Sequence, residues 1–249
     1  MSHIPSLLPQ IVDIARVAGA LIMTHYRTAS EVYRKADASP VTEADREADR
    51  MIVGHLKKIS PGIPIVSEEG EKPDVARAER FWLVDPLDGT KSFIRGNGYF
   101  TVNIGLIENH RTPVLGVIYD PVSRAMYYGS AKGAFREHDG MVNPICVRSK
   151  EDPVTALVSH SHANKATEDY LLAHRIEKRI PCASSIKFCL LAEGRADIYP
   201  RFGPTMEWDI AAGHAILAAA GGSLTTPEGQ PFLYGKENFL NGNFLAVGG

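Results

Sequence analysis

Residues 82–90 read WLVDPLDGT, an apolar run that leads directly into two aspartates. The apolar part is typical of a buried strand that ends at Asp85, and Pro86 lacks the N–H that a continuing strand would donate. Asp88 and Gly89 then favour a turn. Because a straight strand would place residues three apart on opposite faces, we expect this kink to direct the carboxylates of Asp85 and Asp88 toward one point.

The WLVDPLDGT segment also contains the ligand types of a site for a cation and an anion. Carboxylate oxygens and a freed backbone carbonyl, here that of Leu87, are the hard oxygen ligands that Mg²⁺ prefers. The backbone N–H groups of Gly89, Thr90 and Lys91 can receive an anion. The same residue types are common in surface turns, so the segment alone leaves both interpretations open.

Acidic residues stand at the ends of predicted elements elsewhere in the chain. Glu68-Glu69 follows a strand predicted over residues 63–66, a place where α/β proteins hold ligands. Asp45 completes a capping-box pattern, and Asp209 precedes a helix predicted over residues 210–220, so each has an ordinary explanation as a cap. Taken together, these acids predict a cluster that is stable only around cations.

The pattern of the whole chain predicts a layered α/β or α+β architecture. Two amphipathic helices come first, short β-rich runs follow, and strands then alternate with helices. The least periodic segment, Arg148–Pro153, is the predicted boundary between an N-terminal half, residues 1–150, and a C-terminal half, residues 151–249. The predicted helices are 10–27, 42–59, 166–176, 185–193 and 210–220, and the predicted strands are 63–66, 81–84, 101–107, 114–119, 125–129, 154–159, 196–199, 223–226 and 244–247.

Composition and charge argue against several classes of protein. The 249 residues are 44% hydrophobic and 22% charged, so the chain can bury a sizeable core. Lys and Arg number 27 against 29 Asp and Glu, a net charge of −2, which argues against general nucleic-acid binding. Three cysteines without CxxC spacing indicate neither a disulfide framework nor a zinc ribbon, and Cys189, within an apolar run, is predicted to be a core residue.

The sequence shows no membrane or export pattern. The longest run of small apolar residues, 211–222, is too short to span a bilayer, and the N-terminus lacks a basic region followed by an apolar one. We therefore predict a cytoplasmic protein without a transmembrane segment. Nothing in the charge pattern demands contact with a membrane, and peripheral association with its inner face stays an open alternative.

Six segments together carry a resemblance to a known superfamily. The chain resembles the magnesium-dependent, lithium-sensitive phosphatases that include inositol monophosphatase and fructose-1,6-bisphosphatase. Within that group it looks most like the CysQ family of 3'(2'),5'-bisphosphate nucleotidases. The WLVDPLDGT block and the downstream Trp208-Asp209 motif are highly specific as a pair. The segments are Pro40–Asp45, Ser67–Glu69, Trp82–Phe93, Phe100–Ile104, Ser184–Tyr199 and Trp208–Gly213.

This resemblance implies a layered α-β-α-β-α sandwich with two or three Mg²⁺ ions bound between the halves, most of their ligands in the first half. Asp45 and Thr90 match the pair that orients the nucleophilic water. Gly89 and Thr90 match the residues whose amides receive the scissile phosphate, and Glu68 also faces a third, weaker ion in several members. The implied metal ligands are Glu68, Asp85, the Leu87 carbonyl, Asp88 and Asp209.

Substrate choice is expected to depend on residues outside this shared block. The resemblance to nucleotidases places Ser184, Lys187 and Arg201 near the second phosphate and the nucleoside, with His160 or His162 beside them. Arginine offers a fork and lysine a point charge to a phosphate that is not cleaved. A solvated helix position for Lys187 and an ordinary loop charge for Arg201 are the structural alternatives.

The resemblance implies a lithium-sensitive, Mg²⁺-dependent hydrolase of small nucleotides that acts as a monomer or a homodimer. Adenosine 3',5'-bisphosphate would give AMP and phosphate, which clears a by-product of sulfate assimilation, and the 3'-phosphate of adenylyl sulfate would be a second substrate. An inositol monophosphatase-type polyol phosphatase is the alternative, because Glu207 provides an acid just ahead of Trp208, whereas Pro200–Pro204 favours the nucleotidases. A non-catalytic phospholigand sensor is disfavoured because every expected metal and water-orienting residue is present.

Overall fold

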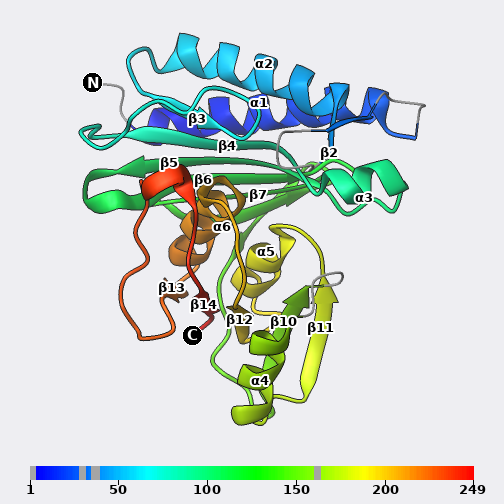
Figure 1. Cartoon of the computed structure of the whole chain (residues 1–249), viewed down its shortest axis with the longest axis vertical. Coiled ribbons are helices and arrows are strands. Elements are labelled where there is room, and N and C mark those ends of the chain that lie inside the picture. The colour runs from blue at the N-terminus through cyan, green and yellow to red at the C-terminus, as the bar shows by residue number, and fades with distance from the viewer. Residues whose placement is uncertain (1–3, 28–31, 35–39, 160–163) are drawn as a thin grey trace.

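The structure is a computed structural model that describes residues 4–27, 32–34, 40–159 and 164–249. Its elements stack in the α-β-α-β-α order that the resemblance implies (Figure 1). A pair of helices covers a seven-stranded sheet, a second pair separates that sheet from a five-stranded one, and a short helix covers the far side. In the order of the layers, the helices are α1 (Ile4–His25) and α2 (Glu43–Ile59), α5 (Ile186–Ala192) and α6 (Glu207–Ala219), and α4 (Lys165–Ala173).

The seven-stranded sheet follows chain order from one edge to the other. Only the pair at its first edge, β3 and β4, is parallel, and every other neighbouring pair is antiparallel. A short helix, α3 (Thr90–Arg95), directly follows β4. The strands are β3 (Ile65–Ser67), β4 (Phe81–Asp88), β5 (Thr101–Glu108), β6 (Thr112–Asp120), β7 (Ala125–Ser130), β8 (Gly133–His138) and β9 (Met141–Ile145).

The five-stranded sheet is mixed and has the order β11-β10-β12-β14-β13. Its three leading strands are parallel, and β14 runs antiparallel to both of its neighbours. The strands are β10 (Thr155–Ser159), β11 (Lys178–Cys182), β12 (Ile198–Arg201), β13 (Ser223–Thr225) and β14 (Phe244–Val247). A separate two-stranded ladder joins β1 (Val32–Arg34) to β2 (Pro40–Thr42), and the 3₁₀ turns are η1 (Asn109–Arg111) and η2 (Glu237–Phe239).

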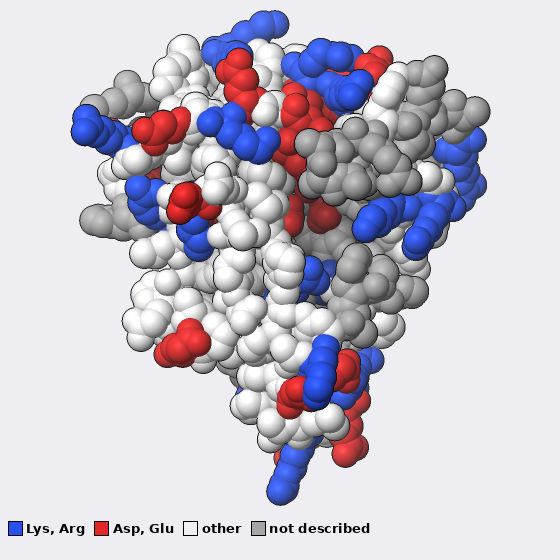
Figure 2. Space-filling view, viewed as in Figure 1, with Lys and Arg blue, Asp and Glu red and all other residues white. Residues whose placement is uncertain are grey.

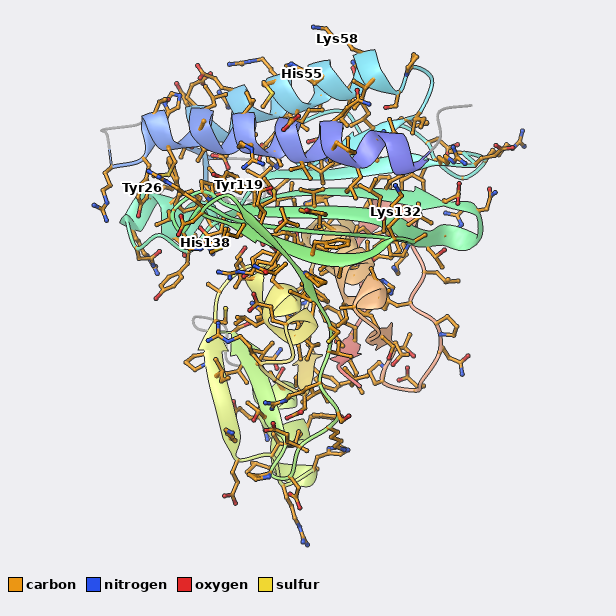
Figure 3. All side chains as sticks on the ribbon, turned by 180° about the vertical axis from the view of Figure 1, so that it is seen from behind. Tyr26, His55, Lys58, Tyr119, Lys132 and His138 are labelled. Carbon is orange, nitrogen blue, oxygen red and sulfur yellow. The ribbon has the colours of Figure 1, made fainter. Side chains whose placement is uncertain are left out.

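The outer helices α1 and α2 are held on the sheet by apolar faces with the predicted helical spacing. On α2, Ala44, Ala48, Ile52 and Leu56 are fully buried, and α1 buries a matching stripe. The opposite face of α2 is solvated, and Figure 3 shows His55 and Lys58 pointing away from the sheet. α2 is therefore an ordinary amphipathic helix.

α1 is the one helix of the described ranges that is long and apolar enough to cross a membrane by length and composition. The stretch in question is Leu7–His25, and half of it is buried inside the protein. Its buried face packs against α2 and the large sheet, as the core helix of a globular protein does. The small-residue run at 211–222 is not part of such a helix, because most of it lies in α6, which has only 13 residues.

α6 lies in the central layer because small residues let both neighbours approach it. Gly116 of β6 is so close that a Cβ there would stand 2.2 Å from the carbonyl oxygen of Ala212. A Cβ on Gly213 would stand 2.4 Å from the ring of Phe188 on α5. This packing fixes the position of α6 and of Asp209 in its first turn.

The predicted helices and strands correspond to observed elements, with two kinds of error. α6 begins at Glu207 instead of residue 210, so Asp209 is the third helical residue and the N-cap is Met206. Strands β1, β2, β8, β9 and β11 and helix α3 were not predicted. In β8, β9, β11 and α3 few residues are buried, so these segments lack a strong apolar period. The boundary between residues 150 and 151 stays a prediction.

Candidate active site

The WLVDPLDGT segment forms the end of β4 and contains the predicted kink. The register with β5 pairs Asp85 with Asn103 and Asp88 with Thr101, so β4 has one extra residue between the two pairs. Within this bulge the Leu87 N–H donates to Asp85 Oδ1 at 3.0 Å. The bulge therefore brings both aspartates to the same side of the sheet edge, as the sequence predicts.

Four carboxylates from three parts of the chain meet beside this bulge. Asp85 is almost fully buried, and burial, followed by the charges of Glu68, Asp88 and Asp209, raises its pKa well above the usual range. The pKa of Asp209 is also raised well above its usual range, first by burial and then by the charge of Asp88. Burial likewise raises the pKa of Asp88. The ionisation of the three aspartates is therefore opposed by burial and by the negative charges around them.

The donor chemistry of this cluster fits a divalent cation. Buried carboxylate oxygens that repel one another are stabilised by positive charge, and Mg²⁺ prefers such hard oxygen ligands. In the described ranges, however, no three His, Cys, Asp or Glu side chains are already arranged to hold a metal ion. The predicted ligands are thus near enough for their charges to interact, but they do not form a complete set of metal ligands. They are Glu68, Asp85, Asp88 and Asp209. Their role as ligands, with that of the Leu87 carbonyl, stays a prediction.

Asp45 and Thr90 are in contact, although they are 45 positions apart in the chain. Asp45 Oδ2 accepts the backbone N–H of Thr42 at 2.7 Å, which caps α2 as the capping-box pattern predicts. Its other oxygen, Oδ1, lies 3.0 Å from the Thr90 hydroxyl, which is also 3.3 Å from the Leu87 carbonyl. Burial raises the pKa of Asp45. One carboxylate therefore both begins a helix and orients a hydroxyl beside the acid cluster.

Asp88 is held by a polar network that the sequence did not reveal. Its Oδ2 accepts hydrogen bonds from the Ser184 hydroxyl and, at 2.8 Å, from the Ser185 N–H. Behind these serines, the Thr101 hydroxyl lies 2.8 Å from both serine hydroxyls, and Ser185 donates to Asn103 at 2.8 Å. The available sequence signal was the pair of polar residues on alternate positions of the otherwise apolar β5. Ser184 thus touches Asp88 directly, and its contact with substrate stays a prediction.

Lys72 is a second residue that sequence reasoning missed. Its ammonium donates to the carbonyls of Ser67, Glu68 and Gly70 at 3.3, 3.1 and 3.4 Å. The same ammonium lies 5.1 Å from the centre of the Trp208 ring on α6. Lys72 therefore ties the loop that carries Glu68 to the helix that carries Asp209.

A cavity of about 540 Å³ opens over this cluster. Glu68, Asp88, Thr90 and Asp209 line it, as do the predicted substrate residues Gly89, Ser184, Lys187 and Arg201. Figure 2 looks toward this hollow, with acidic side chains inside it and basic side chains gathered beside it over α3. Gly89 has φ 107°, and a Cβ there would stand 2.5 Å from the Tyr99 carbonyl oxygen, so only glycine fits this turn.

Lys187 and Arg201 face the cavity but already have partners. Lys187 is 4% exposed and donates to the carbonyls of Ser184 at 2.7 Å and Cys182 at 3.3 Å, and burial lowers its pKa to about 8. Arg201 donates to Ser159 Oγ at 2.9 Å and to the Pro204 carbonyl at 3.2 Å. Neither is the freely solvated side chain of the structural alternative, and their contact with substrate stays a prediction. His160 and His162 lie outside the described residues.

Glu207, the acid that keeps the polyol alternative open, is turned away from the cavity. It is fully buried, and its carboxylate accepts the N–H groups of Gly235 at 2.8 Å and Lys236 at 2.9 Å. The Lys236 ammonium adds a third hydrogen bond at 3.3 Å. Glu207 is thus occupied in fixing the first turn of α6 to the 235–236 loop and does not line the cavity.

Comparisons with known proteins agree on one family. The model of the inositol monophosphatase family matches residues 5–247. The 3'(2'),5'-bisphosphate nucleotidase CysQ of Escherichia coli K12 is 45% identical over 243 residues, covering 96% of this chain and 98% of that protein. The same-named protein of Haemophilus influenzae is 31% identical and covers 97% and 93%.

Solved structures give the same result. The crystal structure of CysQ from Bacteroides thetaiotaomicron, titled a bacterial member of the inositol monophosphatase family, superposes with a TM-score of 0.83 at 39% identity. The match covers 95% of each chain. An IMPase of Thermotoga maritima superposes with a TM-score of 0.78 at 28% identity, covering 97% of this chain and 92% of that one. Both likenesses therefore span almost the whole molecule.

Proposed function

The chain belongs to the inositol monophosphatase family, and on this premise we propose that it is a 3'(2'),5'-bisphosphate nucleotidase. Its substrate is adenosine 3',5'-bisphosphate, which it hydrolyses to AMP and phosphate. The observation that carries this proposal is one cavity lined by acidic and basic side chains, in which the lining residue Thr90 is hydrogen-bonded to the buried Asp45 behind it. Relatives up to 46% identical over 96% of the chain bear the nucleotidase name.

A divalent cation is part of the proposed site. When bound by Glu68, Asp85, Asp88, Asp209 and the Leu87 carbonyl, Mg²⁺ supplies positive charge to the phosphate ester and acidifies bound water. Members of this family are metal-dependent phosphatases, and two or three ions are proposed here. Li⁺ is expected to inhibit, because a monovalent ion in a divalent site neutralises less charge.

The chain's own contribution to the reaction is the orientation of water. The Thr90 hydroxyl has one proton, and donating it to Asp45 Oδ1 at 3.0 Å leaves the hydroxyl oxygen as an acceptor. A water molecule that donates to Thr90 then has a lone pair free to face the phosphorus atom. Asp45 holds this arrangement in place because its other oxygen is fixed by the N-terminus of α2. Binding of the scissile phosphate by the amides of Gly89 and Thr90 is proposed on the same basis.

The polyol phosphatase is a weaker candidate on structural grounds. The acid that would bind a sugar hydroxyl, Glu207, is fully buried and bonded to the 235–236 loop. The cavity instead presents Ser184, Lys187 and Arg201, which we propose contact the nucleoside and its second phosphate. A non-catalytic sensor would have no need for the Asp45–Thr90 pair.

Side-by-side kinetics test the proposal. The value of kcat/KM is measured with Mg²⁺ for adenosine 3',5'-bisphosphate, inositol 1-phosphate and fructose 1,6-bisphosphate, with and without a chelator. We expect the nucleotide to be preferred by a factor on the order of 10² or more, because only a site with donors for a second phosphate gains from it. A preference for inositol 1-phosphate would overturn the assignment. Nucleotide binding without turnover would instead support the sensor.

A further inference from the structure

The basic side chains that line the cavity form two pairs on different elements. Lys187 and Arg201 belong to α5 and β12, beneath the seven-stranded sheet in Figure 1. Lys91 and Arg95 belong to α3, which follows the WLVDPLDGT segment at the end of the large sheet. The family resemblance implies a substrate role for the side chains of the first pair alone.

The two pairs differ in how their charges are used inside the protein. Lys187 and Arg201 donate to three backbone carbonyls and a serine hydroxyl, and the buried Nε of Arg201 is the one donor of this pair that is buried without a partner within the described ranges. Among the described residues, Lys91 and Arg95 have no side-chain hydrogen bond, ion pair or ring contact. The α3 pair therefore retains its full hydrogen-bonding capacity for a ligand.

Lys91 and Arg95 also repel each other. They are four residues apart, so they share one face of α3, where like charges cost roughly 0.2–0.5 kcal/mol. No carboxylate of the described residues forms an ion pair with either of them. Repulsion between neighbouring charges that nothing in the chain offsets is typical of a functional site. An anion bound over this face of α3 would relieve it.

The place of the pair in the chain indicates which anion it binds. Lys91 directly follows Thr90, which touches Asp45 beside the acid cluster where a phosphate is to be cleaved. Arg95 lies one helical turn farther on, about 6 Å along the axis. Lys91 and Arg95 are both exposed, and both line the cavity that contains the acidic side chains.

We propose that Lys91 and Arg95 are specificity-determining residues that bind the uncleaved phosphate of a nucleoside bisphosphate. Arginine supplies a two-pronged donor and lysine a mobile point charge, a combination suited to a phosphate dianion. The inference rests on the proposed function and adds a cationic contact on α3 to the one proposed for Lys187 and Arg201. Lys187 and Arg201, each held by two hydrogen bonds to the protein, lie on the opposite wall.

The test compares two substrates that differ only in the second phosphate. Lys91→Gln/Arg95→Gln is assayed with adenosine 3',5'-bisphosphate and with adenosine 3'-monophosphate, and Lys58→Gln serves as a control on the outer face of α2 (Figure 3). We expect KM for the bisphosphate to rise at least tenfold, while kcat and KM for the monophosphate change less than about twofold. Calorimetry without turnover should show weaker binding of 5'-AMP to the double variant.

Two results would overturn the inference. One is an equal change, or no change, in KM for both substrates in the α3 variant. The other is a selective rise in KM confined to Lys187→Gln. These failures are separable from failure of the proposed function, because the latter appears in the unmodified protein as a preference for inositol 1-phosphate. Thermal unfolding of each variant excludes misfolding as the cause of a lost activity.

Discussion

α2 and α6 begin in the same way and lie in opposite surroundings. Each has an aspartate as its third residue that accepts the N–H of the N-cap residue, at 2.7 Å for Asp45 and 2.8 Å for Asp209. α2 exposes one face to solvent, whereas α6 is buried almost throughout. A cap that looks purely local can therefore bring a carboxylate into a shared site, and the layer of the helix determines what that carboxylate meets.

The second oxygen of each aspartate shows the difference. Asp45 Oδ1 lies against the Thr90 hydroxyl, a neutral donor. Asp209 instead faces other acids, and Asp88 is the neighbouring charge that most raises its pKa after burial. We infer that Asp45 orients a water molecule and that Asp209 contributes to the cation site. Substitutions at the two aspartates can test this division between the two helices.

The largest expected effect is that of Asp209→Asn. Asparagine can still accept the Met206 N–H, so the cap is retained, but the charge that attracts a cation is lost. We expect kcat/KM to fall by about three orders of magnitude or more and Mg²⁺ affinity to fall with it. Without Mg²⁺ the melting temperature should stay the same or rise, because the variant removes a repelled buried carboxylate.

Calorimetric Mg²⁺ titration and thermal unfolding check this prediction. Near-normal turnover with saturating Mg²⁺ would show that Asp209 is only a helix cap. A folded variant with unchanged Mg²⁺ affinity and low activity would assign it a role other than metal binding. The matched control is Asp13→Asn on α1, which changes the same group on a helix distant from the cap.

Asp45→Asn should have the next largest effect, on turnover alone. The amide retains a cap acceptor but is a weaker acceptor for the Thr90 proton, so the water is less well oriented. We expect kcat to fall by roughly 10²–10³-fold, with Mg²⁺ affinity unchanged. Combining it with Thr90→Val should cost little more than either change alone, because both break one interaction.

Kinetics and Mg²⁺ titration of the two single variants and the double variant provide the measurement. Fully additive losses would mean that Asp45 and Thr90 act separately. Weakened Mg²⁺ binding in Asp45→Asn would remove the distinction between α2 and α6.

Each of the two helices contains a histidine. His214 of α6 is buried, whereas His55 of α2 is exposed. His214 lies 3.0 Å from the Tyr234 hydroxyl, and burial, helped by the Lys236 charge, lowers its pKa from 6.5 to about 4. Below pH 6.5 the unfolded chain binds a proton that the folded chain refuses, so stability is lost as the pH falls. The expected loss by about pH 4 is about 3 kcal/mol.

Urea unfolding of wild type and His214→Gln at several pH values between 7.5 and 4.5 isolates this contribution. The variant should be less stable at pH 7.5, where the contact with Tyr234 is lost, and should show a shallower decline toward acid. His55→Gln on the exposed face of α2 is the control and should keep the wild-type slope. Parallel curves for wild type and His214→Gln would refute the prediction.

The sequence predicted the parts of this site that local chemistry determines. The bulge at Asp85–Asp88 follows from a proline and an Asp-Gly turn after an apolar strand, and the Asp45 cap follows from a four-residue pattern. Both interactions span only a few positions, so their residue types are sufficient to predict them. The family resemblance then supplied roles that spacing alone could not.

The remaining features depend on contacts between distant segments. Thr101 and Asn103 were only polar positions on a strand until the serines that follow β11 were placed against them. The importance of Lys72 depends on Trp208, which is 136 positions away, and is invisible without the fold. Glu207 looked like a sugar ligand until the 235–236 loop was seen to occupy it.

The smallest expected effects are those of replacing two glycines, one packed against α6 and one within α2. Gly116 faces α6, where a Cβ would stand 2.2 Å from the Ala212 carbonyl oxygen, so Gly116→Ala should lower the unfolding free energy by about 1–3 kcal/mol. Gly54 lies inside α2, where a Cβ would meet nothing within 4 Å. Gly54→Ala should therefore raise the unfolding free energy by roughly 0.5–1 kcal/mol, the difference in helix propensity.

Denaturant unfolding of both variants at one pH compares them directly. We expect the two changes in unfolding free energy to have opposite signs. α6 has no free volume beside Gly116, whereas the solvated face of α2 can accept a methyl group at Gly54. A stabilised Gly116→Ala would mean that α6 can move away from β6, and then the position of Asp209 would not be fixed by packing. In that case Gly116→Ala should also lose Mg²⁺ affinity, though less than Asp209→Asn does, because moving α6 would displace the Asp209 carboxylate.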